Sequence, residues 1–276
     1  MRILIAPDSF KGTFTSADAA QLIQAGLHSI NPNLDCVCFP LADGGEGTLD
    51  VLVDALAGRL KTTQVLDPSG NTKDARYGLV ENNQTAVVEV AEAIGLNHVT
   101  PSRRTPWNFS SFGAGQLLRA ALSEQITRII IGTGGTATND GGAGLLQGLG
   151  VKFLDRENNP LPQFVKPRDL ISVRKAEATD LKRFLSGVSV EVGHDVDNPL
   201  LGHNGATSVF GPQKGIKVEE ISKFESALAH YSEVIGKATG KKAATTPGAG
   251  SAGGIGFSLV SALEAKMSPG AHLVMD

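Results

Sequence analysis

The sequence has few of the residues that cross-link small secreted proteins and no segment that would span a membrane. Only two of its 276 residues are cysteines, Cys36 and Cys38, and they alternate with their neighbours in a strand-like pattern. This pattern places both thiols on one face of a strand, which disfavours a disulfide between them, and the lack of a second cysteine pair disfavours a structural zinc site. No continuous apolar run is long enough to cross a bilayer, and the start of the chain does not resemble a signal peptide. We therefore predict a cytoplasmic protein without a membrane partner.

The content of aromatic residues and the net charge are also low. Aromatic residues make up 5% of the chain, and the formal net charge is −3. Such a charge gives no general attraction to nucleic acid or to an anionic membrane, so any anion must be bound by a local site. Aliphatic residues dominate and there are 33 glycines, which suits an α/β architecture better than an all-β sandwich. The length fits one large or two ordinary domains, and we favour two.

The spacing of apolar residues predicts a β-α-β-α order at the start of the chain, which implies parallel strands. The expected elements there are a strand over 1–6, a helix over 15–30 with Thr15 or Ser16 as N-cap, a strand over 34–40 and a helix over 48–56. After residue 58 the pattern changes to strands separated by turn residues, so a domain boundary is expected there. The elements expected after it are strands near 62–66, 76–80, 86–90, 129–131 and 189–192 and helices near 113–122 and 218–238.

The most informative segment is the glycine-rich run IIIGTGGTATNDGGAG over 129–144, which joins an apolar strand to a helix-like pattern. Glycines let backbone N–H groups approach an oxyanion, and a helix N-terminus favours negative charge. The run therefore predicts a phosphate or nucleotide site, although glycines that only permit tight packing remain an alternative. Two further glycine loops, at 41–48 and 246–256, indicate a shared polar cleft.

Two segments near the start of the chain follow predicted strands, where open α/β sheets bind ligands. In PDSFKG, over 7–12, Ser9 offers a hydroxyl and Lys11 a compact positive charge for a carboxylate or phosphate. In the next loop stand Asp43 and Glu46, and a carboxylate there is suited to bind magnesium or to accept a hydroxyl proton. The alternative for the first segment is that Ser9 caps a turn and Lys11 is solvated, and for the second it is local capping of the following helix.

Three later segments also carry candidate side chains. Asp195 and Asp197, separated by one residue after a strand, suit a hard cation and an adjacent base. Lys214 is available to a transferring phosphate, and Arg103 and Arg104 offer a bidentate fork to a small carboxylate. The competing interpretations are an Asx turn before Pro199 and an exposed loop at Arg103.

Six segments together resemble, in order and spacing, the bacterial glycerate kinases of the first type: PDSFKG, PLADGGEGT, GTGGTATNDGGAG, HDVDNPLLG, FGPQKG and PGAGSAGG. The similarity extends over essentially the whole chain. It implies phosphorylation of D-glycerate by ATP with Mg²⁺. It also implies two α/β domains, a Rossmann-like or flavodoxin-like parallel-sheet domain and a mixed α/β domain inserted in it. We expect 1–58, with 270–276, in the first domain and 59–269 in the inserted one.

The resemblance carries a set of matched positions, to which we assign roles by inference. The expected catalytic residues are Asp195, Asp43 and Lys11; the substrate-binding residues are Ser9, Arg103 and Lys214; the nucleotide-binding residues are Gly134, Gly135, Thr136 and Asn139; the metal ligands are Asp197 and Asp140. The favoured product is 2-phosphoglycerate. The alternative is a non-catalytic fragment of the same fold that binds an anion or a nucleotide, and the oligomeric state, including a homo-oligomer, is left open.

The chain departs from the family pattern at three points. His194 and Phe112 stand where the family usually has Cys and Tyr. His194 is expected to be structural, because no second histidine stands at metal-ligand spacing. Family members also continue well beyond Asp276 with strands that complete the first domain. We therefore expect the first domain to be incomplete, with an exposed sheet edge.

Overall fold

The computed structural model of the chain describes residues 1–10 and 13–275, and it alternates strands and helices along its whole length. The strands are β1 (Arg2–Ile5), β2 (Asp35–Cys38), β3 (Arg59–Leu66), β4 (Thr72–Val80), β5 (Thr85–Glu89), β6 (Arg128–Gly132), β7 (Lys152–Leu154), β8 (Lys175–Glu177), β9 (Ser189–His194) and β10 (Lys266–Pro269). The α-helices are α1 (Ser16–Ile30), α2 (Thr48–Ala55), α3 (Ala91–Ile94), α4 (Phe112–Leu122), α5 (Ala143–Gly148), α6 (Thr179–Phe184), α7 (Ala206–Lys214), α8 (Ile221–Thr239), α9 (Ser251–Leu263) and α10 (Gly270–Met275). The predicted α/β class is confirmed.

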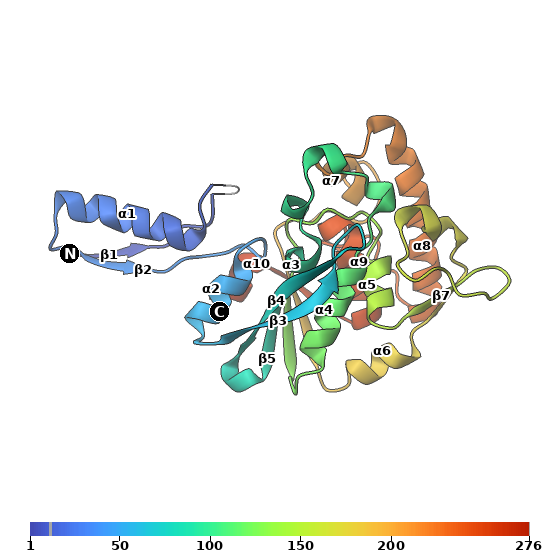
Figure 1. Ribbon diagram of the computed structural model, residues 1–276, viewed down its shortest axis with the longest axis horizontal. Helices are drawn as coiled ribbons and strands as arrows, with labels where there is room; N and C mark the ends of the chain where they lie inside the picture. The colour runs from blue at the N-terminus through green and yellow to red at the C-terminus, as the bar shows by residue number, and fades with distance from the viewer. Residues whose placement is uncertain (11–12, 276) are drawn as a thin grey trace.

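The first two strands and α1 form a small unit that stands apart from the rest of the chain in Figure 1. Strands β1 and β2 pair in parallel, as predicted. Helix α1 begins with a capping box, in which the Thr15 hydroxyl accepts from the Asp18 N–H and the Asp18 carboxylate accepts from the Thr15 N–H. The unit leaves large apolar side chains exposed on β1, on α1 and directly after β2, among them Leu4, Leu22 and Phe39.

The main body is built on a six-stranded sheet with the order β10-β9-β6-β5-β4-β3. Strands β5, β6, β9 and β10 are parallel, whereas β3, β4 and β5 pair antiparallel. The turn between β3 and β4 is closed by Asp67, whose Oδ1 accepts from the N–H groups of Ser69 and Asn71. A separate antiparallel pair, β7 and β8, lies beside α8. The turn residues at 68–71 and 82–83 thus mark the changes of direction that the sequence predicted.

Alternate residues of the strands face two different cores. Ile129 and Ile131 of β6 belong to the larger cluster, which contains residues of α4, α5, α8 and α9. Ile130 points to the opposite face, where it packs with α2 and with Leu273 of α10. The continuous apolar run of β6 is therefore explained by burial on both faces, as is usual for parallel strands.

Helix α2 falls within the predicted first domain but packs on the six-stranded sheet. Its residues Leu49, Leu52 and Val53, at helical spacing, contact Val80 and Val87 of β4 and β5. The two sheets lie on either side of residue 58, but α2 joins the second one, and the boundary at 58 stays a prediction. No helix in the part of the chain that the structure describes has the length and apolar character to cross a membrane.

Candidate active site

The site lies at the edge of the sheet where the parallel strands end, and a row of glycines shapes it. Strands β5, β6 and β9 align Glu89, Gly132 and Gly193 side by side in register. A methyl group on Gly132 would lie 2.9 Å from the Gly44 carbonyl oxygen, and one on Gly193 would lie 3.3 Å from the Gly44 Cα. The loop after β2 therefore crosses the strand ends in direct backbone contact. Glycine permits this close approach because it has no Cβ.

The glycine loop after β6 packs equally closely on the same segment. A Cβ on Gly134 would lie 2.5 Å from the Gly45 Cα. Gly135 has a φ of 69°, a left-handed conformation that glycine adopts without strain. Loops that are some 90 residues apart in the sequence are thus brought together at one point of the sheet edge.

These loops border a cavity of about 470 Å³. It is lined by residues from the three glycine loops, from the 3₁₀ helix Leu96–His98, from the segment after β9 and from α7: Gly45, Glu46, Leu96, Asn97, Thr133, Gly134, Gly135, Thr136, Asp195, Val196, Phe210, Gln213, Lys214, Ser251 and Ala252. The shared polar cleft predicted from the glycine loops is therefore present. Five of the predicted site residues line it: Gly134, Gly135, Thr136, Asp195 and Lys214.

Lys214 is the last residue of α7, and its ammonium group is buried at the inner end of the cavity. Only 2% of the residue is exposed. The Nζ donates to the Thr138 carbonyl oxygen at 2.7 Å and to the Thr136 Oγ1 at 3.2 Å. Burial lowers the pKa of Lys214 to about 7, and the charge of Asp140 opposes this only in part. The ammonium form is therefore short of compensating negative charge.

Asp140 is fully buried and does not line the cavity, unlike the metal ligand that the sequence predicted. Its Oδ2 accepts from the Ser111 N–H and the Ser111 hydroxyl, both at 2.8 Å, and from the Gly144 N–H, while its Oδ1 accepts from the Gly142 N–H. Burial raises the pKa of Asp140 in spite of these donors. The geometry is that of a carboxylate that holds the glycine loop to the start of α5, and a metal role for it has no support in these contacts.

Asn139, predicted to bind phosphate, also lies behind the loop rather than in the cavity. Its Nδ2 donates to the Thr207 hydroxyl of α7 at 2.9 Å. This contact ties the glycine loop to the helix that carries Lys214, so Asn139 acts on the position of both.

The two aspartates after β9 lie in different surroundings. Asp195 lines the cavity, whereas Asp197 lies outside its lining with a side chain that is 86% exposed. His194 is buried, and its Nδ1 lies 2.9 Å from the Val196 carbonyl oxygen, a contact that shapes the segment between the two aspartates. The spacing of one residue thus separates the two carboxylates instead of pairing them.

Several predicted residues are not brought to the cavity lining. Ser9 lies in the separate unit at the end of β1, and Arg103 is exposed. It is Arg104 that reaches the site, where its Nη1 donates to the carbonyl oxygen of Gln213, a lining residue. Asp43 stands at the start of a lining loop, and its Oδ1 accepts from the Gly45 N–H. Lys11 lies outside the described residues.

Glu89 is a residue of the site that sequence reasoning missed. It ends β5, is buried, and accepts from the N–H groups of Gly47 and Leu49 at 3.2 to 3.3 Å. Helix α2 has no capping side chain of its own, so Glu89 caps it from another strand and holds the Gly44–Gly47 loop in place. The only sequence signal was a carboxylate at the end of an otherwise apolar strand, VVEV.

Replacing Glu89 with glutamine is expected to change how stability depends on pH. Burial raises the pKa of Glu89 to about 7 from the ordinary 4.5. The folded protein then binds a proton more tightly than the unfolded chain, so stability falls as pH rises from 4.5 to 7, by on the order of 3 kcal/mol for this group. Urea unfolding at pH 5 and pH 8 should show the glutamine variant gaining stability relative to the parent protein at the higher pH.

The exposed carboxyl of Glu219 provides a matched control, because Glu219→Gln should leave the difference between the two pH values unchanged. If the free energy of unfolding changed with pH in the same way in the parent protein and in Glu89→Gln, the raised pKa of Glu89 would be contradicted.

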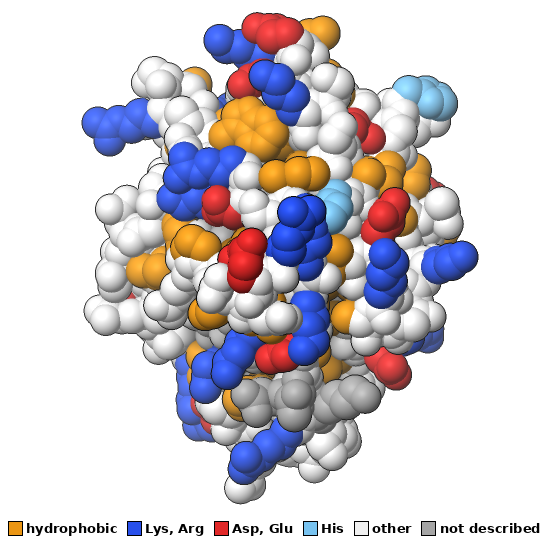
Figure 2. Space-filling view, turned by 90° about the vertical axis from the view of Figure 1, so that its right-hand side faces the viewer, with side chains coloured by type: hydrophobic (Ala, Val, Ile, Leu, Met, Phe, Trp, Pro, Cys, Tyr) orange, Lys and Arg blue, Asp and Glu red, His pale blue; other side chains and the backbone are white. Residues whose placement is uncertain are grey.

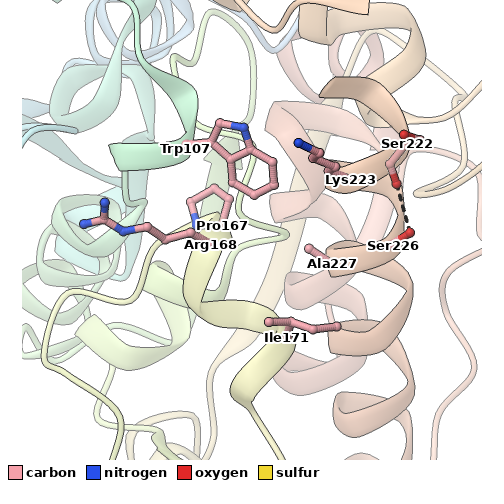
Figure 3. A pocket seen from close by; sticks show the side chains of 8 residues that line it. All are labelled: Trp107, Pro167, Arg168, Ile171, Ser222, Lys223, Ser226 and Ala227. Atoms are coloured by element: carbon pink, nitrogen blue, oxygen red, sulfur yellow. Dashed lines mark hydrogen bonds between the residues drawn. The ribbon is translucent and has the colours of Figure 1, made fainter. Parts of the chain in front are cut away.

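A second cavity, of about 530 Å³, lies between α8 and two 3₁₀ helices, at Pro106–Asn108 and Pro167–Ser172. Figure 3 shows Trp107 above Pro167, with Lys223 facing it from α8. Trp107 stacks on Phe224 with ring centroids 3.8 Å apart. The walls are largely apolar and include none of the predicted site residues that the structure describes. On the face of the molecule in Figure 2, positive and negative side chains are interspersed with apolar ones.

Comparison with known proteins identifies the family of this chain. The sequence model of the glycerate kinase family matches residues 3–276. The chain belongs to the glycerate kinase family. It is 42% identical to the glycerate kinase of Halalkalibacterium halodurans, over 99% of this chain and 72% of that protein. It is 39% identical to the glycerate 2-kinase of Escherichia coli K12, over 99% of this chain and 71% of that protein.

A solved structure extends the similarity to the fold. The crystal structure assigned as glycerate kinase 2 from Salmonella typhimurium LT2 superimposes with a TM-score of 0.89 and 40% sequence identity. The superposition includes 100% of this chain and 73% of the Salmonella protein. The predicted family and the mixed α/β fold of this glycerate kinase homologue are confirmed.

Proposed function

We propose that this kinase transfers the γ-phosphoryl group of ATP to a hydroxyl of D-glycerate and forms 2-phosphoglycerate. The observation that carries the proposal is the convergence of a glycine loop, Asp195 and Lys214 on one cavity at the ends of parallel strands. The name of the E. coli relative, a glycerate 2-kinase, supports the choice of hydroxyl. A cytoplasmic location stays a prediction.

The chain's own groups divide the work of phosphoryl transfer, in which positioning and electrostatics dominate. Backbone N–H groups of Gly134, Gly135 and Thr136 would hold phosphate oxygens. The Asp195 carboxylate would orient the attacking hydroxyl and accept its proton. Lys214 would supply positive charge at the inner end of the cavity, where burial strengthens each interaction.

The residues that line the cavity also fit Mg²⁺, which the family implies. Mg²⁺ prefers oxygen ligands and takes only one or two carboxylates from the protein when substrate phosphates supply the others. The cavity is lined by two carboxylates, Glu46 and Asp195, and Glu46 would hold the ion while Asp195 faces the hydroxyl. When bound, Mg²⁺ neutralises charge on the phosphates. No cluster of three or more metal-binding side chains occurs in residues 1–10 and 13–275, so a dedicated protein cage is not the basis of this proposal.

Coupled release of ADP in the presence of D-glycerate, ATP and Mg²⁺ tests the function directly. We expect turnover that requires all three components, with a product whose phosphorus resonance couples to the proton on C2 of glycerate. Binding of ATP without turnover would instead support the alternative, a non-catalytic nucleotide-binding fragment. Coupling to the C3 protons would show the other regiochemistry.

A further inference from the structure

Ser251, at the start of α9, has a buried hydroxyl without a partner among the described residues. The residue is 3% exposed and lines the cavity, and its Oγ makes no hydrogen bond to any described residue. A buried polar group that is left unpaired costs about 1–3 kcal/mol. A hydroxyl in this position is therefore prepared for a ligand that enters the cavity.

The backbone after Ser251 is held in an unusual conformation that places it against Lys214. Ala252, Gly253 and Gly254 have φ values of 52°, 69° and 91°, three left-handed residues in succession. The left-handed conformation is unfavourable for Ala252 because of its Cβ. Such strain persists only where the surrounding structure enforces it. A Cβ on Gly253 would lie 2.9 Å from the Lys214 Nζ, so the ammonium group lies directly against this turn.

The charges around the cavity select the kind of anion that fits beside these two groups. Lys214 is the single cationic side chain in the described part of the lining, whereas Glu46 and Asp195 are both acidic. One buried ammonium balances one negative charge, which matches a carboxylate better than a chain of phosphates. The backbone N–H groups of the Gly134–Thr136 loop remain available for phosphate oxygens.

From these contacts we propose that Lys214 and Ser251 form the subsite that binds the carboxylate of the hydroxy acid. The Lys214 ammonium pairs with the carboxylate, and the Ser251 hydroxyl donates a hydrogen bond to it. This arrangement directs the hydroxyl groups of the acid toward Asp195. It replaces Ser9 and Arg103, which lie outside the lining, as the carboxylate-binding residues. The low pKa of Lys214 agrees with a site whose charge is completed by the ligand. The subsite rests on the proposed function.

The test compares Ser251→Ala with Ser261→Ala. Ser261 also belongs to α9, is 2% exposed and has an unpartnered Oγ, but it does not line the cavity. Loss of one hydrogen bond to a charged group should raise KM for D-glycerate about ten- to a hundredfold in Ser251→Ala, with KM for ATP changed less than about twofold. Ser261→Ala should change neither constant. Urea unfolding of both variants checks that the fold is kept.

A pair of inhibitors identifies the group that is recognised. D-Lactate keeps the hydroxy acid carboxylate, whereas D-lactamide replaces it with a neutral amide. The parent protein should bind D-lactate more tightly than the amide, and Lys214→Met, which removes the ammonium group that pairs with the carboxylate, should lose most of this preference. Calorimetric binding of the two compounds gives the same comparison without turnover.

Three results would overturn the subsite. These are a rise in KM for ATP with KM for D-glycerate unchanged, equal effects of Ser251→Ala and Ser261→Ala, and an unchanged preference for D-lactate in Lys214→Met. Failure of the proposed function is a separate result, because it would appear as no phosphorylation of D-glycerate by the parent protein. The calorimetric comparison would still decide the subsite in that case.

Discussion

Replacing Asp195 with asparagine is expected to lower kcat for glycerate phosphorylation about a hundredfold or more, which corresponds to about 2.7 kcal/mol of transition-state stabilisation. The amide has the shape of the carboxylate but cannot accept a proton from the attacking hydroxyl. KM values should change little, since the side chain keeps its place at the end of β9. Coupled ADP release measures the rate, and urea unfolding verifies the fold.

Two neighbouring carboxylates separate the chemistry of Asp195 from a general effect of charge. Asp197→Asn removes the same charge two residues away, on a side chain outside the cavity lining, and we expect a loss below about threefold. Glu46→Gln removes the other lining carboxylate and should raise the concentration of Mg²⁺ that is required. Near-normal turnover in Asp195→Asn together with a hundredfold loss in Glu46→Gln would move the base from Asp195 to Glu46.

The sequence predicted the elements that carry this site better than the contacts within it. The spacing of apolar residues and the positions of turn-forming residues identified β6, α5 and the parallel pair β1 and β2. Burial on one or two faces of an element imposes such a spacing directly. The glycine loops pointed to the cavity, because close backbone approach requires glycine wherever the chain segments meet.

The parts that were missed depend on contacts between distant segments. Glu89 caps α2 across some 40 residues of sequence, and no local pattern distinguishes it from a strand-end carboxylate in solvent. The spacing of Asp195 and Asp197 indicated a pair, but the turn fixed by His194 sends only Asp195 into the cavity. Asp140 matched a family motif, yet its four hydrogen bonds give it a structural position. A motif thus located the site, whereas tertiary packing decided which of its polar side chains face the ligand.

Replacing Lys214 with methionine is expected to reduce kcat/KM for glycerate phosphorylation about a hundred- to a thousandfold, because the single cationic side chain in the described lining is lost. The same change should also remove a contribution of Lys214 to the pH dependence of stability. With a folded pKa of about 7 against the ordinary 10.5, the buried ammonium costs the folded state on the order of 5 kcal/mol below pH 7. This cost declines as pH rises from 7 to 10.5, since the folded protein then binds fewer protons than the unfolded chain.

Urea unfolding at pH 7 and pH 9.5 measures this cost without relying on catalysis. The parent protein should gain stability relative to Lys214→Met at the higher pH, while the loss of the hydrogen bonds to Thr136 and Thr138 shifts both values equally. Lys223→Met, on an exposed lysine of α8, should show no such trend. A difference between Lys214→Met and the parent protein that is constant with pH would mean that the ammonium is already balanced in the folded state. Activity and stability therefore make opposite demands on Lys214, as expected of a buried charge that is kept for the ligand it binds.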